Sequence, residues 1–196
     1  MEYETIDTLP QEEAHLAYIK TPIRCADGVI FPNQFTEGVR CRDTYPATAR
    51  IGMDPEWPAI QLGGVVANTS RILVVHEALK NLIQAAMKSQ DEIEFLPLAI
   101  VNHKGRVASE AYFIINPIGT LDCLDQKRSK FIFTGDGRLY RVEKYVLDSK
   151  KIAWEPAIFR PKEAPSQYII NGKITTAFKD SGFTDRNVMI EELEIV

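Results

Sequence analysis

The sequence predicts an α+β fold, with a mixed but mostly antiparallel sheet, two main helices and a loop-rich N-terminal third. Three observations lead to this prediction. Apolar runs typical of strands recur through the second half of the chain, two amphipathic segments have helical spacing, and prolines and glycines are concentrated near the N-terminus. The length of 196 residues fits one domain over 1–196, in which 1–68 is loop-rich and 69–196 forms a regular α/β core.

Helix and strand breakers set the character of the N-terminal third. Residues 22–64 hold five of the 11 prolines and five of the 11 glycines. Proline lacks an N–H donor and restricts the residue before it, so regular elements in this segment should be short. We expect short strands and turns there, for instance a strand at 28–31. The first 13 residues hold five acids and no base, which predicts a solvated face.

The most regular segment predicts a strand, a helix and two further strands. Residues 72–75 form a β-branched apolar run typical of a strand. The apolar residues that follow recur at helical spacing: Val75, Leu79, Leu82, Ile83, Ala86 and Met87. This stripe predicts a helix that begins near His76, and the alternating segment 93–98 predicts the next strand. The continuous apolar run at 111–115 predicts a strand buried on both faces.

A hairpin is predicted further along the chain. Residues 130–134 and 139–142 have strand character and flank the turn Gly135-Asp136-Gly137, in which Asp-Gly is a strong hairpin signal. The apolar residues at 152–154 and 157–159 predict two more strands.

The C-terminal segment repeats the pattern of residues 74–95 at a constant offset of 95 residues. The corresponding apolar residues are Ile169, Ile170, Ile174, Ala177, Phe178, Val188 and Ile190. No residue in 74–95 is identical to its counterpart, so the pattern predicts a repeated strand–helix–strand unit and not a demonstrated duplication. Gly182 suits the C-terminal cap of the second helix.

Composition and charge argue against several classes of protein. The net charge of −4 and the lack of a wide basic face argue against a dedicated nucleic-acid binder. A local basic cluster with aromatic neighbours, at 127–133, is interpreted as a solvated loop. No apolar run reaches the roughly 18 residues that a membrane span needs. The N-terminus has no signal-peptide pattern, and three cysteines without paired spacing fit a reduced, cytoplasmic protein.

Motifs for metal, cofactor or nucleophilic chemistry are absent from the sequence. The three histidines have no His or Cys neighbour at ligand spacing, and no glycine-rich phosphate loop is present, so we expect no metal and no cofactor. The acids beside Cys123 disfavour its thiolate form. Asp122 and Asp125 lie three residues apart, a spacing better explained by turn capping or ion pairing than by acid–base catalysis.

Three stretches of the chain carry a family pattern: the strand-to-helix entry at 74–82 with the strand at 93–98, the segment 112–129, and the closing unit at 168–192. The second stretch is the most specific, with an apolar strand followed by Asn116, Asp122, Asp125 and Ser129. In these stretches the chain resembles the bacterial polymorphic-toxin immunity protein family, the Myxococcus-type immunity domain that was formerly a domain of unknown function. His76 departs from the family, which usually has Ser or Thr at this position.

The resemblance implies binding, not a reaction. Members of this family are thought to bind and neutralise a cognate toxin, often one delivered by type VI or contact-dependent secretion. The resemblance implies a toxin protein as the partner, and it implies no catalytic residue. We interpret Asn116, Asp122, Asp125 and Ser129 as structural residues whose side chains hydrogen-bond to the backbone. Because no export signal is visible, we expect a toxin with a cytoplasmic target. The sequence predicts no oligomeric state.

Acidic residues are the expected contacts for a basic toxin, through electrostatic steering. The acids most available for this are Glu12, Glu13, Glu191, Glu192 and Glu194.

Two alternatives stay open at this stage. A small hydrolase or transferase would need Asp122, Asp125, His103 and Cys123 to meet in one pocket. A ligand-binding module would need a well-formed apolar pocket.

Overall fold

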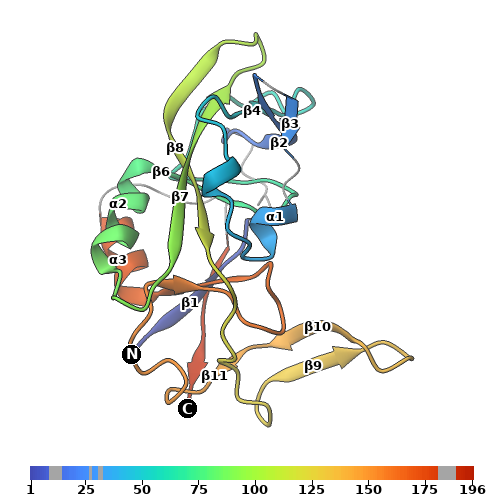
Figure 1. The fold of residues 1–196 in the computed structure, drawn as a ribbon, viewed down its shortest axis with the longest axis vertical. Helices are drawn as coiled ribbons and strands as arrows, with labels where there is room; N and C mark the ends of the chain where they lie inside the picture. Colours follow the sequence, from blue (N-terminus) through green and yellow to red (C-terminus); the bar gives the residue numbers. More distant parts are fainter. Residues whose placement is uncertain (9–14, 27, 31–32, 181–188) are drawn as a thin grey trace.

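The fold is described from a computed structural model, which covers residues 1–8, 15–26, 28–30, 33–180 and 189–196 (Figure 1). The helices are α1 (Asn33–Thr36), α2 (Glu77–Ala86) and α3 (Gly172–Asp180), with one 3-10 turn, η1 (Arg42–Thr44). The strands are β1 (Tyr3–Ile6), β2 (Ile19–Cys25), β3 (Gly28–Ile30), β4 (Arg50–Met53), β5 (Val65–Val66), β6 (Leu73–His76), β7 (Ile93–Val101), β8 (Val107–Pro117), β9 (Lys130–Phe133), β10 (Leu139–Lys144), β11 (Val146–Leu147), β12 (Ile158–Phe159), β13 (Tyr168–Asn171), β14 (Ile190–Glu192) and β15 (Glu194–Ile195). The predicted α+β class is confirmed.

Seven strands form the main sheet, in the order β3-β2-β4-β7-β8-β6-β5. Its neighbouring strands are antiparallel except for β4 and β7, which are parallel. Four of these strands, β2 to β5, come from the N-terminal third, where the predicted short elements are found. That third therefore extends the sheet on both sides of β7, β8 and β6, as well as packing against it.

The inner end of β8 is buried on both faces, as its continuous apolar sequence predicts. Ile114 packs in one core cluster with residues of the N-terminal third, such as Phe35. Its neighbour Ile115 packs in a second cluster with residues of α2 and α3. Since successive strand residues point to opposite faces, an apolar run without alternation needs cover on both sides. The two helices provide that cover on one side (Figure 1).

A second, four-stranded antiparallel sheet has the order β12-β13-β1-β14. Its central strand β1 buries Tyr3 and Ile6, which are each 1% exposed. The predicted solvated face is therefore wrong at residues 3–6, because the apolar side chains between the acids direct this segment into a sheet. The carboxylate of Glu4 lies 3.7 Å from the ammonium group of Lys179.

The predicted repeat is present, and the residues that pair across the strands of the two units also correspond. In each unit a strand leads into a helix and then a second strand, and a third strand lies antiparallel between the two, as in a split β-α-β motif. One row of aligned residues across the first unit is Val75, Phe113 and Pro97. The matching row across the second unit is Ile170, Glu4 and Glu192. The outer residues of these rows differ by 95 in both cases, while the middle strand is β8 in one unit and β1 in the other.

The two helices also begin at matching positions. His76 is the N-cap of α2, and its Nδ1 accepts a hydrogen bond from the N–H of Ala78 at 3.2 Å. At the offset of 95, Asn171 Oδ1 accepts from the N–H of Lys173 at 3.0 Å. Each side chain satisfies one of the N–H groups that a helix start leaves without an intrahelical partner. The imidazole of His76 thus does the work that Ser or Thr usually does.

One predicted strand is wrong and two predicted positions cannot be compared. Residues 152–154 form a turn, although Ile152 is fully buried in a core cluster. Apolar character there reflects burial of a turn and not strand pairing. The cap at Gly182 and the strand residue Val188 lie outside the described residues.

Candidate functional site

The most prominent surface feature is the hairpin of β9 and β10, which we call the arm (residues 127–144). The hairpin itself is confirmed as predicted. Within the described part of the chain its two strands pair only with each other, and Figure 1 shows them extending away from the rest of the molecule. The register shifts between Leu139 and Arg141, which places Tyr140 in a β-bulge. The arm is therefore a separate two-stranded sheet and not a part of either larger sheet.

Hydrogen bonds order the tip of the arm. The N–H of Thr134 donates to the carbonyl of Arg138 at 2.8 Å, and the N–H of Gly137 donates to the carbonyl of Thr134 at 2.9 Å. Asp136 accepts hydrogen bonds from the Thr134 hydroxyl and from Arg138 Nε, and these two contacts hold the pKa of its carboxyl below the usual value. Gly137 has φ +80°, a conformation that favours glycine. The tip is thus held in one conformation by its own residues.

The base of the arm is anchored in the protein. Phe131 and Val142 are cross-strand partners, and both pack against a third core cluster. Just before β9, the Ser129 hydroxyl donates to the carbonyl of Val146 at 3.2 Å and accepts from its N–H at 3.1 Å. The base is therefore buried and hydrogen-bonded, while the distal part projects.

Apolar side chains are exposed on the distal part of the arm. Phe133 is 59% exposed, Leu139 36% and Tyr140 69%. Phe133 and Leu139 are cross-strand partners, and Tyr140 follows directly in the bulge. Neighbouring exposed apolar groups of this size mark interaction surfaces more often than single ones do.

The arm is basic although the protein is acidic. It holds six basic residues and two acids: Lys127, Arg128, Lys130, Arg138, Arg141 and Lys144, against Asp136 and Glu143. Its net charge is therefore +4, which leaves −8 for the rest of a chain whose total is −4. Four of the six basic residues form ion pairs: Lys130 and Arg141 with Glu143, Arg138 with Asp136, and Lys144 with Glu194.

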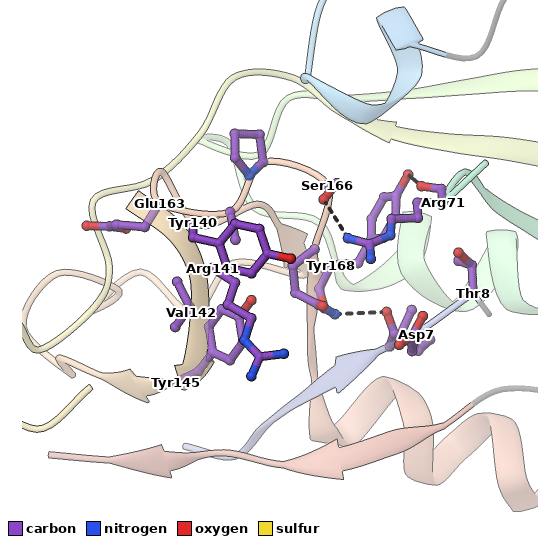
Figure 2. A pocket seen from close by; sticks show the side chains of 14 residues that line it. Asp7, Thr8, Arg71, Tyr140, Arg141, Val142, Tyr145, Glu163, Ser166 and Tyr168 are labelled. Carbon is purple, nitrogen blue, oxygen red and sulfur yellow. Dashed lines mark hydrogen bonds between the residues drawn. The ribbon is translucent and has the colours of Figure 1, made fainter. Parts of the chain in front are cut away.

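A cavity of about 420 Å³ lies between the arm and the segment 163–168 (Figure 2). Figure 2 shows Tyr140 and Arg141 on one side and Arg71 on the other. The guanidinium of Arg71 lies 3.5 Å from the hydroxyl of Ser166. The lining is mainly polar and carries both charges, so this cavity is not the apolar pocket that a ligand-binding module would need.

The predicted acidic contacts are only partly within the described residues. Glu191 and Glu192 lie on β14 and Glu194 on β15, and all three line a second cavity of about 330 Å³ beside the base of the arm. Lys144 lies 2.7 Å from Glu194, and this hydrogen bond lowers the pKa of the Glu194 carboxyl. Glu12 and Glu13 lie outside the described residues. The acids' contact with a toxin stays a prediction.

Asn116 lies at the buried end of β8. Its amide donates to the carbonyl of Val39 at 2.8 Å and to the carboxylate of Glu94 at 3.0 Å. Glu94 is 2% exposed, and it also accepts from the N–H groups of Cys41 and Arg42 at 2.9 and 3.0 Å. Because a buried carboxylate needs such partners, Asn116 and Glu94 together join β7 and β8 to the segment before η1.

Asp122 and Asp125 lie on the segment between β8 and the arm. Asp122 forms an ion pair with Lys151 at 2.6 Å, and this hydrogen bond lowers the pKa of the carboxyl. One oxygen of Asp125 accepts from the N–H groups of Lys127 and Arg128 at 2.8 and 2.9 Å, which lowers its pKa as well. Asp125 therefore caps the turn from which the arm begins.

The four residues of the enzyme alternative do not meet. His103 lies in the exposed loop between β7 and β8, whereas Asp122, Cys123 and Asp125 belong to the segment after β8, and these two segments lie at opposite ends of the molecule (Figure 1). Cys123 is fully buried, and burial raises the pKa of its thiol to about 12. The pocket that this alternative requires is not formed.

Sequence reasoning missed one buried charge of structural importance. Arg160 is 1% exposed, and its guanidinium donates to the carbonyl of Pro117 at 3.2 Å, to that of Pro165 at 2.7 Å and to that of Phe35. It also donates to the hydroxyl of Tyr168 at 2.9 Å and lies 4.2 Å from the centre of that ring. Among the described residues no carboxylate forms an ion pair with it. The only local signal is an arginine between an apolar strand and a proline.

Glu94 was missed as well, because in an alternating strand an acid between apolar residues is expected on the solvent face. It is buried instead, since both faces of β7 are covered.

In the part of the chain that the structure describes, no group of three or more His, Cys, Asp or Glu side chains could hold a metal ion. No helix among the described residues is long and apolar enough to cross a membrane.

Comparison with known proteins gives one family. The model of a family described as "Immunity protein family (Imm11)" matches residues 4–187. No curated protein matches the chain. The matched range contains the whole arm, including its buried base, and the first of the two split β-α-β units.

Proposed function

Because this chain belongs to the immunity protein family Imm11, we propose that it binds a cognate secreted toxin and neutralises it by covering the toxin's surface. The observation that carries the proposal is the family match over residues 4–187 of 196. The resemblance inferred from the sequence is thereby confirmed at the level of the family. An immunity function implies a toxin as the partner, and the family suggests a protein that is not an enzyme.

Several features of the site support occlusion over chemistry. The candidate catalytic residues lie apart, and Asp122 and Asp125 each form local hydrogen bonds. The surface instead offers an exposed apolar patch on a projecting arm. A standard interface takes about 800 Å² from each partner, which is under a tenth of the 10296 Å² of accessible surface.

The place of action belongs to the same proposal. We propose a cytoplasmic protein, a toxin with a cytoplasmic target, and delivery of that toxin by a type VI or related secretion system. The acids Glu191, Glu192 and Glu194 are proposed to contribute steering toward a basic region of the toxin, because attraction between opposite charges on two partners raises the rate of encounter.

Co-expression tests the proposal. The toxin domain encoded by the neighbouring gene is induced in a bacterial host, alone or with this chain. We expect growth arrest by the toxin alone and normal growth when both are present. As a matched control, a co-expressed immunity protein of another family should give no protection. Growth arrest that persists with this chain present at high level would contradict the proposal.

A further inference from the structure

We propose that the arm is the element that enters the toxin, and that the surface receiving it is an acidic cleft. This inference rests on the proposed function, and it deepens it by assigning a contact surface and the chemistry of the partner. The argument uses the shape of the arm, its exposed side chains and its charge.

The shape of the arm suits insertion. It projects from the molecule, whereas Phe131 and Val142 hold its base against a core cluster. The tip is ordered by hydrogen bonds among Thr134, Asp136 and Arg138. A pre-ordered element loses little conformational entropy on binding, so more of its contact energy contributes to affinity. A convex element of this kind fits a cleft better than it fits a flat surface.

The exposed side chains of the arm are those that dominate binding energies. Phe133, Leu139 and Tyr140 form an exposed apolar group. In the sequence, Arg138 directly precedes Leu139 and Arg141 directly follows Tyr140. Tyrosine and arginine are enriched among the few interface residues that carry most of the energy. The bulge at Tyr140 presents its ring beside the cavity between the arm and the segment 163–168 (Figure 2).

Charge sets the chemistry of the receiving surface. The arm carries +4 in a protein whose remaining residues carry −8: its projecting residues 133–141 contribute +1, and the base contributes the other +3 around the entrance of a cleft. A basic toxin region would be attracted to the rest of the protein and repelled by the arm, so the arm needs an acidic site. Enzyme active sites are clefts, and an acidic one would be blocked by an arginine- and tyrosine-bearing hairpin. Occlusion of the toxin then follows from insertion.

A nucleic acid fits these observations less well than a protein does. The net charge of −8 around a compact basic segment would repel a phosphate backbone that extends beyond the arm. A second copy of this chain also offers acidic surface, including the cavity of about 330 Å³ that Glu191, Glu192 and Glu194 line. Both occupants are therefore outcomes that the test has to separate from the toxin.

The test measures affinity for the purified toxin domain encoded by the neighbouring gene, by titration calorimetry. Two variants change the exposed arm without touching its base: Tyr140→Ala and Arg141→Glu. Matched controls change an exposed apolar residue and an exposed arginine elsewhere: Ile60→Ala, at a position 66% exposed, and Arg106→Glu. Thermal unfolding of every variant verifies that the fold is kept.

We expect Tyr140→Ala to weaken binding by about 10- to 100-fold. Arg141→Glu should weaken it by about tenfold or more and reduce its sensitivity to salt. The controls should bind within about twofold of wild type. Toxin binding by both arm variants at wild-type affinity would overturn the inference while leaving the proposed function in place. Failure of the wild-type chain to bind the toxin domain would overturn both.

Two further readouts identify other occupants. Light scattering measures whether the wild-type chain dimerises, and fluorescence anisotropy measures binding to a labelled single-stranded RNA. Arm-dependent dimerisation or RNA binding, with toxin affinity unchanged by the arm variants, would overturn the inference in favour of that occupant. A monomer with no arm-dependent RNA binding supports it.

Discussion

Replacing Arg160 by methionine removes a buried charge together with all its hydrogen bonds. In the native protein the guanidinium connects α1 to the end of β8 and to the segment 161–168, through carbonyls of Phe35, Pro117 and Pro165. Methionine has a similar length and is apolar, so it fills much of the same space without a donor. The substitution therefore tests the hydrogen bonds more than the packing.

The magnitude follows from the carbonyls that lose their donor. The carbonyl of Pro117 loses its buried donor, whereas that of Phe35 keeps a longer hydrogen bond from the Tyr168 hydroxyl at 3.4 Å. A buried acceptor left unsatisfied costs about 1–3 kcal/mol, and the weakened acceptor adds about 1 kcal/mol, so the sum is about 2–4 kcal/mol. Removing a buried charge offsets part of this, since burial of an ion is itself unfavourable. We expect a net loss of about 1–3 kcal/mol in the free energy of unfolding.

Urea denaturation, followed by circular dichroism, measures this free energy. The matched control is Arg138→Met, whose native side chain is 84% exposed and which should change stability by less than about 0.5 kcal/mol. An Arg160→Met protein as stable as wild type, with an unchanged m-value, would refute the reasoning. It would mean that the cost of burying the charge cancels the hydrogen bonds.

Three further predictions concern a glycine, a capping acid and the cysteines. Gly38→Ala should lower the melting temperature more than Gly105→Ala, because both have positive φ but only at Gly38 would a Cβ meet backbone, at 2.6 Å. Equal losses would contradict the close approach. The pKa of Asp125 is lowered by two N–H groups, so its contribution to stability is present at neutral pH and is lost as pH falls through the folded-state pKa. Asp125→Ala should lower stability at pH 7 much more than at pH 2, as measured by urea denaturation; an equal loss at both values would count against the cap. Cys25 is half-buried, whereas the pKa of buried Cys123 is about 12, so native alkylation at pH 8 should label Cys25 and leave Cys123 unlabelled in mass spectra. Rapid labelling of Cys123 in the folded protein would contradict its burial.

The repeated units could be predicted because their signal is local. A β-branched run followed by a helical stripe fixes β6 with α2, and the same pattern 95 residues later fixes β13 with α3. Which strand lies between the two outer strands of each unit could not be predicted. β8 follows its unit in the sequence, whereas β1 lies far before its unit, and only strand pairing in three dimensions shows that they occupy equivalent places. Ile152 shows the other limit, since an apolar residue reports burial and does not report the conformation that buries it.

For the candidate site, the hairpin turn could be predicted from the sequence, but the exposure of the aromatic side chains on the hairpin could not. Gly135-Asp136-Gly137 specifies the hairpin from sequence alone. Apolar character at Phe133 and Tyr140 normally predicts burial, so the sequence could not show that these two rings are exposed while Phe131 is packed. The basic cluster at 127–133, interpreted as a solvated loop, is the start of the arm. Arg160 was missed because two of its partners, Phe35 and Pro117, lie far away in the sequence.

The central claim is that this chain neutralises a toxin by occupying it, and stoichiometric inhibition tests this most directly. The activity of the purified toxin domain encoded by the neighbouring gene is measured while this chain is added in increasing amounts. Occlusion predicts that activity falls in proportion to the added chain and reaches its minimum at one chain per toxin. Full toxin activity in the presence of excess chain, or complete loss at a small fraction of one equivalent, would contradict the claim.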